Sequence, residues 1–493
     1  MSDQSQARVT KRISRLRLTL FYLSALAITL FPLCLIEVGL RLFISPLQAD
    51  IDDPYVSFKG LRPLFVLDAT DTHYETAPNR LDFFRTQSFT VDKKPDKFRI
   101  FCLGGSTVQG RPYSVETSFP TWLKLNLHAA QPQTDYEVIN CGGISYASYR
   151  LIPIIRELLK HKPDLFILYT GHNEFLENIS YNHVKRLPQT LIHLHQILLK
   201  LRSYSLIHKY LYNHRSKENA SRTSLPTEVH AALDLNNGLK SYHRDDKQRA
   251  QTIMEFRRNL VKMLMIAQNA GVPIILMNPV SNLKDSTPFK SEFCKSISGR
   301  HREQIKDIWR QSSEIPWSNA YGKIKLLEKA IKLDKRNAKS LYMMAKCHQR
   351  LGRVSDAKKW FILAKDEDIC PLRILEPMHQ VIRETAERFK VQLVDVRKLI
   401  ENQTEDGIPG NQWLLDHVHP NISGHQLIAD SLLKTMQDMG LVKTPGSWRK
   451  TLDELRRSHL DSLNQAYYEQ GAMRLERLQK WSRGRIPDSD AHP

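Results

Sequence analysis

The chain has 493 residues, of which 41% are hydrophobic and 9% aromatic, with 20 Gly and 24 Pro. This composition supports a sizeable buried core and excludes a collagen-like, low-complexity or mostly disordered chain. Lysine and arginine outnumber aspartate and glutamate by 72 to 52, so the formal net charge is +20. Such a charge favours an anionic partner without choosing among nucleic acid, anionic lipid and acidic glycan.

The first apolar segment, residues 18–38, is long enough to cross a bilayer. Glu37 is its only charge, and about 20 helical residues span a ~30 Å hydrocarbon core. Basic residues crowd the segment before it, so the positive-inside rule places the N-terminus in the cytoplasm. We predict a basic cytoplasmic N-terminus (1–17), a transmembrane helix (18–44) and an extracytoplasmic remainder, periplasmic or at the cell surface. A buried core helix is the alternative, and an extracytoplasmic location disfavours nucleic acid as a partner.

Five short apolar runs alternate with longer helical patterns from about residue 97 onward. Uninterrupted apolar runs are typical of strands covered on both faces, and these lie at 99–103, 136–140, 164–170, 273–278 and 391–396. The helical patterns lie at 119–130, 149–161, 247–270 and 374–390. The alternation predicts an α/β fold with a parallel five-stranded sheet and helices on both faces. Its ligands are expected at the carboxyl ends of the strands.

Two stretches interrupt this alternation. Residues 175–246 are polar and rich in histidine and basic residues, with a helical piece at 187–211, and we interpret them as a cap or surface lobe. Residues 301–373 are helical throughout, and 338–371 have the pattern of a tetratricopeptide repeat, with matches at Leu341, Met344, Ala345, Gly352, Ala357, Phe361 and Ala364. A degraded repeat precedes it, and an ordinary helical hairpin is the alternative. The other predicted domains are a sheet domain in two parts and a charged helical tail: 49–300, 374–445 and 446–493.

The cysteines and histidines show no metal-binding or disulfide pattern. Cys34 lies in the apolar segment, and the other five cysteines have the spacing of neither a disulfide framework nor a zinc site. The histidines between 183 and 214 lack the acidic partners of a metal motif, so no metal is expected. The glycine-rich residues 104–110 lack the Lys-Ser/Thr ending of a phosphate-binding loop, and no cofactor is expected.

Of four notable polar stretches, three lie immediately after predicted strands and the fourth lies late in the chain, beyond the last strand. The first is 104–110, in which Ser106 occupies a strand-to-helix turn that exposes its hydroxyl and leaves its backbone N–H free. The others are 140–145, 171–174 and 416–420. Because the carboxyl ends of parallel strands meet at one edge of a sheet, these stretches are expected to converge.

Taken in this order, the four stretches resemble the sequence blocks of the SGNH (GDSL-type) hydrolase superfamily, over roughly residues 97–175, 270–285 and 390–440. The matching residues of blocks one, three and five are Gly104, Ser106, Gly110, Gly171, Asn173, Glu174, Asp416, His419 and Pro420. The departures are Gly105 and Thr107, where the family's tetrad has Asp and Leu, and Ser145, where block two usually has Gly. The resemblance implies an SGNH-type, flavodoxin-like fold.

The resemblance and elementary chemistry assign the same roles. Ser106 would be the nucleophile, His419 its general base and Asp416 the carboxylate that orients the imidazole. The oxyanion would be bound by the Ser106 N–H, by an amide in the Gly143–Ser145 segment and by the Asn173 side chain. The Gly-x-Ser-x-Gly elbow of the α/β-hydrolases does not occur around Ser106.

We therefore predict a membrane-anchored serine esterase that cleaves an acyl ester of an envelope glycan or lipid, with a protein partner at the helical repeats. One alternative is an O-acyltransferase on the same fold, in which an alcohol replaces water. The other is an inactive membrane-tethered interaction protein that uses its repeats. The presence of all four groups, Ser106, Asn173 and the Asp416–His419 pair, argues against the inactive protein.

Overall fold

The structure, a computed structural model, divides the chain into two compact units. One comprises residues 1–61 and 179–227, and the other 62–178 and 228–493. The described residues are 22, 24, 31–32, 35–41, 63–177, 198, 201–204, 229, 231–234, 238–444, 446 and 448–483. Most of the predicted transmembrane helix (18–44) and of the helical piece at 187–211 lies outside them. Within the described ranges, no helix combines the length and the apolarity needed to cross a membrane.

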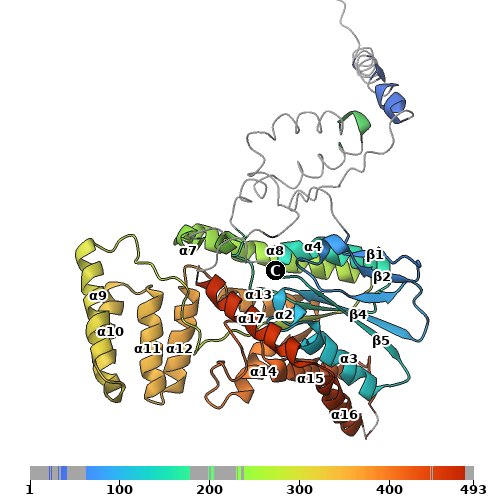
Figure 1. Ribbon diagram of the computed structural model, residues 1–493. Helices are drawn as coiled ribbons and strands as arrows, with labels where there is room; N and C mark the ends of the chain where they lie inside the picture. Colours follow the sequence, from blue (N-terminus) through green and yellow to red (C-terminus); the bar gives the residue numbers. More distant parts are fainter. Residues whose placement is uncertain are drawn as a thin grey trace, which may run out of the picture. The chain divides into compact units, whose positions relative to one another are not determined.

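The second unit is built on a five-stranded parallel sheet (Figure 1). Its strands are β4 (Lys97–Gly104), β5 (Asp135–Gly142), β6 (Leu165–Tyr169), β7 (Ile274–Asn278) and β8 (Gln392–Asp395). Their order is β5-β4-β6-β7-β8, and every neighbouring pair is parallel. The five predicted strands and the parallel α/β fold are confirmed. The order reverses direction at β4, so the carboxyl end of β4 is the point where a ligand site is expected.

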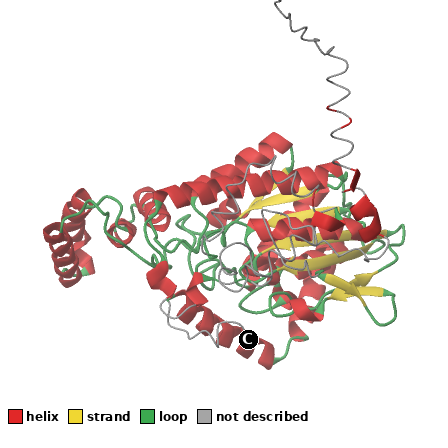
Figure 2. Ribbon diagram, turned by 90° about the horizontal axis from the view of Figure 1, so that it is seen from above, coloured by secondary structure: helices red, strands yellow, loops and turns green. Residues whose placement is uncertain are grey.

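Helices cover both faces of this sheet (Figures 1 and 2). Residues Phe101 and Leu103 of β4 pack into a core with α4 (Ser148–Leu158), α8 (Asp246–Asn269) and α13 (Glu376–Phe389). Residues Ile100 and Cys102 pack on the opposite face with α3 (Phe119–Ala130), α14 (Val396–Gln403) and α15 (Ile422–Asp438). Because both faces are buried, most of the strands contain runs of successive apolar residues, which is why they could be recognised in the sequence.

A small antiparallel sheet, which the sequence did not reveal, packs beside the main one. Its strands, in the order β1-β2-β3, are β1 (Phe65–Leu67), β2 (His73–Thr76) and β3 (Ser88–Thr90), and the 3-10 helix η1 (Pro78–Arg80) lies between the last two. The Phe89 ring of β3 lies 5.4 Å from that of Phe101 in β4. Arg99 joins the two sheets, because its buried guanidinium donates to Glu137 Oε2 at 2.6 Å and to the Thr90 carbonyl oxygen at 2.7 Å.

The segment predicted to be helical, 301–373, contains four helices: α9 (Gly299–Glu314), α10 (Ala320–Leu333), α11 (Ala338–Arg350) and α12 (Val354–Asp366). The 3-10 helix η7 (Trp317–Asn319) leads into α10. The side chains of Ser298, Asn319 and Asn337 cap the first three helices by accepting hydrogen bonds from backbone N–H groups three residues further on. The pair α11–α12 is joined by a three-residue turn and packs through Ala345 and Ala357.

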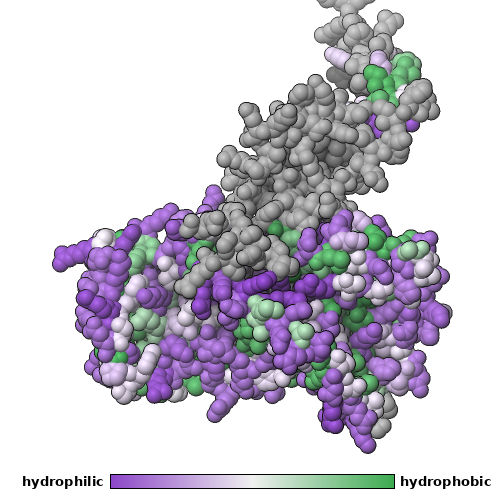
Figure 3. All heavy atoms as spheres, viewed as in Figure 1, coloured by the Kyte–Doolittle hydropathy of each residue, from purple (hydrophilic) through white to green (hydrophobic). Residues whose placement is uncertain are grey.

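The charged tail is helical, as predicted, and packs back onto the second unit. Its helices are α16 (Trp448–Asp461) and α17 (Gln465–Ser482). Arg456 of α16 donates from Nη2 to Asn126 Oδ1 of α3 at 2.8 Å. The remaining elements are short: α2 (Ser106–Gln109), η2 (Val115–Thr117), η3 (Leu159–His161), η6 (Ala232–Asp234) and α7 (Gly238–Ser241). The face of this unit seen in Figure 3 is mostly hydrophilic.

Buried histidines make the stability of this unit depend on pH. Burial, followed by the charges of Arg99 and Lys160, lowers the pKa of His161 from 6.5 to about 4. The unfolded chain therefore takes up this proton near pH 6.5, whereas the folded chain stays neutral until about pH 4, so stability falls as the pH is lowered through that window. At pH 5 the loss is about 2 kcal/mol for such a histidine. We expect a lower thermal midpoint at pH 5 than at pH 7.

The control for this prediction is a matched pair of variants. His161→Gln removes one buried titrating group and should reduce the difference between the two midpoints, whereas His301→Gln, at an exposed position of α9, should leave it unchanged. Equal pH dependence in wild type and His161→Gln would contradict the prediction.

Candidate active site

Ser106 is the first residue of α2 and follows directly after β4. A Cβ at Gly104 would overlap the Tyr169 carbonyl oxygen of β6, so only glycine allows these two strands to approach so closely. Gly110, with φ of 98°, ends the turn. The Ser106 N–H has no hydrogen-bond acceptor among the described residues, as expected for the first residue of a helix.

Ser106, His419 and Asp416 form one continuous hydrogen-bonded chain. The Ser106 hydroxyl oxygen lies 2.8 Å from His419 Nε2, and His419 Nδ1 lies 2.6 Å from Asp416 Oδ2. The other carboxylate oxygen accepts hydrogen bonds from the backbone N–H groups of Val418 and His419, both at 2.8 Å. A proton on Nδ1, donated to the carboxylate, leaves Nε2 free to accept the serine proton.

The surroundings keep Asp416 ionised. Burial by itself would raise the pKa of Asp416, but His419 and the hydrogen bonds to the carboxylate outweigh burial and hold this pKa below its usual range. His417 Nδ1 lies 3.7 Å from Asp416 Oδ1, yet burial lowers the pKa of His417 to about 4 against the attraction of the carboxylate. His417 is therefore neutral, and the carboxylate charge remains available to His419.

One of the predicted oxyanion donors, the Asn173 side chain, lies next to the Ser106 turn. Asn173 Nδ2 donates to the Tyr146 carbonyl oxygen at 3.0 Å, and a Cβ at Gly105 would lie 2.6 Å from this same nitrogen. The Asn173 amide therefore packs against the residue that precedes the serine.

The two block-two amides named from the sequence, those of Gly143 and Ser145, differ in their hydrogen bonding. The Gly143 N–H donates to the Gly104 carbonyl oxygen at 3.0 Å and is occupied. Ser145 adopts a left-handed conformation with φ of 61°, and its N–H has no acceptor in the described part of the chain. Within the predicted segment Gly143–Ser145, the N–H groups of Gly143 and Ile144 are both hydrogen-bonded, so the Ser145 N–H is the one available to a ligand.

Other residues of the blocks hold the site together. The Glu174 carboxylate accepts from the Ser148 N–H at 2.8 Å and from its hydroxyl at 2.7 Å, so it fixes the start of α4. Asn140 Nδ2 donates to the Val108 carbonyl oxygen at 2.8 Å and ties β5 to α2. These contacts explain why the blocks contain polar residues that do not take part in the chemistry.

Sequence reasoning assigned no role to His172, which also belongs to this site. Its Nδ1 accepts from the Ile374 N–H at 3.2 Å, and its buried Nε2 has no partner among the described residues. Burial first, and then His417 and His419, lower its pKa well below the usual value, so the ring is neutral. Only its position directly after a buried strand could have drawn attention to it.

The described residues contain no group of three or more His, Cys, Asp or Glu side chains placed to hold a metal ion. The histidines between 183 and 214, weighed as metal ligands from the sequence, lie outside the described residues. The five cysteines that are described are free.

Comparison with solved structures finds esterases among the similar chains. The acetyl xylan esterase AlAXEase is 13% identical, with a TM-score of 0.31, and the match covers 69% of this chain and 99% of that one. A putative lipolytic protein of the G-D-S-L family from Desulfitobacterium hafniense is 10% identical, with a TM-score of 0.29 and coverage of 68% and 98%. Axe2, an acetylxylan esterase from Geobacillus stearothermophilus, is 12% identical, with a TM-score of 0.31 and coverage of 68% and 93%.

TM-scores this low do not by themselves assign a fold or an activity to this chain. No protein-family model and no curated protein matches it. The interpretation of the site therefore depends on its own geometry.

The hydrogen-bonded chain predicts that Ser106 is selectively reactive. A fluorophosphonate probe phosphonylates a serine whose proton is removed by a positioned base. We expect it to label Ser106, detected by mass spectrometry of the modified peptide, and we expect the labelling to be lost in His419→Gln. His301→Gln, the matched substitution at an exposed site, should label like wild type. Labelling of Ser106 at an equal rate in His419→Gln would show that the imidazole is not its base.

Proposed function

We propose that this chain is an SGNH-type serine esterase that hydrolyses an acyl ester. The observation that carries the proposal is the continuous chain from the Ser106 hydroxyl through both nitrogens of His419 to the buried Asp416 carboxylate. Three groups brought together from positions up to 313 residues apart have the geometry of nucleophile, base and orienting acid.

In the first half of the proposed reaction, His419 Nε2 takes the hydroxyl proton while Ser106 Oγ attacks the ester carbonyl carbon. The negative charge that develops on the carbonyl oxygen is stabilised by the N–H groups of Ser106 and Ser145 and by Asn173 Nδ2. His419 then gives its proton to the leaving alcohol, and the acyl group remains on Ser106.

In the second half, a water molecule replaces the alcohol. His419 removes a proton from the water, the resulting hydroxide attacks the acyl carbonyl carbon, and the acid departs as Ser106 recovers its proton. Asp416 remains ionised throughout and stabilises the imidazolium that forms in each half. In the transferase alternative a second alcohol attacks at this step, so analysis of the products distinguishes the two reactions.

We also propose that residues 18–44 anchor the chain in a membrane and that the esterase faces away from the cytoplasm. The large apolar side chains described in this segment are exposed, with relative exposures of 65% for Phe31, 57% for Leu35 and 55% for Val38. Exposed apolar side chains of this density are suited to lipid, and the basic residues 8–17 favour a cytoplasmic N-terminus. An acyl ester on an envelope glycan or lipid would then be the accessible substrate.

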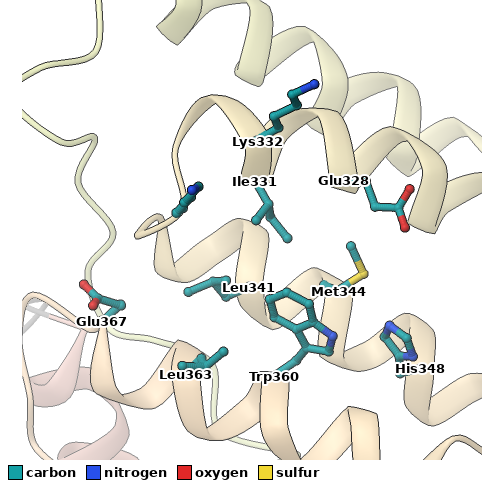
Figure 4. Close-up of a pocket in the computed structure, with 10 residues that line it drawn as sticks. Glu328, Ile331, Lys332, Leu341, Met344, His348, Trp360, Leu363 and Glu367 are labelled. Atoms are coloured by element: carbon teal, nitrogen blue, oxygen red, sulfur yellow. The ribbon is translucent and has the colours of Figure 1, made fainter.

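The helices of residues 301–373 are proposed to be tetratricopeptide-like and to bind a protein partner. A pocket of about 430 Å³ opens between α10, α11 and α12. Figure 4 shows Ile331, Leu341 and Trp360 pointing into it, with Glu328 and Lys332 at its edge. An apolar floor with charges of both signs around it suits an apolar side chain of a protein segment. This surface supports the alternative of an interaction protein. Binding of a partner here would not require Ser106, whereas the esterase reaction would.

Turnover of p-nitrophenyl acetate by the full chain tests the esterase. Ser106→Ala should abolish turnover above background because no other group supplies the nucleophile. Asp416→Asn should lower kcat by about 10⁴-fold, since an amide stabilises neither the correct tautomer nor the imidazolium. Asn173→Ala should lower kcat by about 10²- to 10³-fold through loss of one oxyanion donor.

Ser355→Ala, at an exposed position of α12, is the control and should retain wild-type turnover. Activity that survives Ser106→Ala would refute the proposed nucleophile. A folded protein without turnover on p-nitrophenyl acetate or longer acyl esters would favour the interaction protein.

A further inference from the structure

Three arginines from distant parts of the chain gather beside the triad. Arg111 follows the Ser106 turn directly, and its backbone N–H donates to the Ser106 carbonyl oxygen at 3.1 Å. Its side chain is within electrostatic range of Arg85, Arg474 and Asp416. The Arg111 guanidinium thus interacts electrostatically with two other cations and with the carboxylate of the candidate triad.

The arginines are held by specific contacts of the segments that carry them. The loop before Arg85 is attached to the site at the Phe83 carbonyl oxygen, which accepts from Gln109 Nε2 at 2.8 Å and from the Ile144 N–H at 2.9 Å. Arg474 lies on α17 and donates from Nη1 to the Tyr113 carbonyl oxygen at 2.8 Å. These hydrogen bonds fix the segment that leads to Arg85 and the side chain of Arg474 in their places in the fold.

Arg85 and Arg111 are partly buried, and they differ from the fully buried arginines of this unit in having no protein partner for their guanidinium groups among the described residues. Arg99 is buried and pairs with Glu137, and Arg150 is buried and pairs with Glu177. The guanidinium groups of Arg85 and Arg111, by contrast, form no ion pair or hydrogen bond within the described residues, and the Nε atom of each is buried.

The absence of a partner has an energetic cost. Burial, followed by repulsion from Arg85 and Arg474, lowers the pKa of Arg111 to about 10 although Asp416 opposes the shift. Glu116 attracts Arg85 without forming an ion pair with it. Withdrawing part of an unpaired cation from water is unfavourable unless an anion compensates it, and a bound ligand can supply that anion.

We propose that Arg85 and Arg111 bind an anionic group, a carboxylate or a phosphate, on the substrate whose ester is presented to Ser106. This inference rests on the proposed esterase function and narrows its substrate to acidic esters. A planar guanidinium donates two parallel hydrogen bonds to a carboxylate or phosphate. Arg474 adds a third positive charge, and the net charge of +20 favours the approach of an acidic polymer or lipid.

Three substrates that differ only in the group at C6, one neutral and two anionic, test the proposal. They are methyl galactoside, methyl galacturonoside and methyl galactoside 6-phosphate, each carrying one acetyl group on the same hydroxyl. We expect the full chain to hydrolyse at least one acidic ester with a kcat/KM about 10- to 100-fold above that of the neutral ester, which is what charge-assisted hydrogen bonds contribute. The preferred acidic ester distinguishes a carboxylate from a phosphate.

Variants of Arg85 and Arg111 test whether these two residues cause the preference for acidic esters. In Arg85→Gln and Arg111→Gln the ratio of acidic to neutral kcat/KM should fall toward one, mainly through KM, and Arg111→Lys should restore part of it. Taking the ratio within each variant cancels any effect that the substitution has on the triad itself. Arg300→Gln, which removes an exposed charge on α9, should leave the ratio at its wild-type value. Ser106-dependent turnover without a charge preference, or with a preference that both Gln variants keep, would overturn the anion site and leave the esterase standing.

Binding without turnover provides an independent measurement. In a Ser106→Ala background, inorganic phosphate or unacetylated methyl galacturonoside should raise the thermal midpoint, whereas neutral methyl galactoside should not. Adding Arg111→Gln should remove the rise. If no ester is hydrolysed by the wild type but this shift is seen, the esterase fails and the anion site stands. If neither anion shifts the midpoint, the anion site is wrong.

Discussion

The site depends on how closely the strand ends approach one another at the carboxyl edge of the sheet. A Cβ at Gly104 would overlap the backbone of β6, and one at Gly142 would overlap the backbone of α2 at Gln109. With glycine at both positions, the strand ends and α2 pack closely, and the loop after β6 places Asn173 against Gly105, the residue before Ser106. The proposed oxyanion donors are therefore positioned by backbone packing at the point where the strand order reverses.

The protonation states of the carboxylate and the imidazoles at the site depend on the same close packing. Groups excluded from water keep a charge only where neighbours compensate it. Asp416 has such neighbours, namely two backbone N–H groups and His419, whereas His417 and His172 are driven to the neutral form. A single ionised carboxylate thus acts on His419, and no other imidazole competes as a cation beside it. This arrangement is what a base that must accept a proton from serine requires.

The sequence predicted the parts that have a local signature. The strands contain apolar runs because both faces of the sheet are buried. Ser106 lies in a short motif just after β4, and Asp416 and His419 lie in a short motif beyond the last strand. The antiparallel sheet was missed because its strands have only three or four residues. The choice between Gly143 and Ser145 could not be made, since it depends on a backbone angle and on an occupied amide.

The three arginines show a second limit of prediction from the sequence. Positions 85, 111 and 474 form no sequence pattern, and only the fold brings them together. Arg474 reaches the site because α17 packs on the loop after Ser106, where the Tyr467 and Tyr113 rings stack with centroids 5.9 Å apart. The triad has no hydrogen bond to α17 among the contacts of the described residues. Arg111 follows the turn that carries Ser106, whereas the tail adds Arg474 to the proposed anion site through its own contact with Tyr113. Changes in the tail can alter substrate choice while leaving the Ser–His–Asp geometry in place.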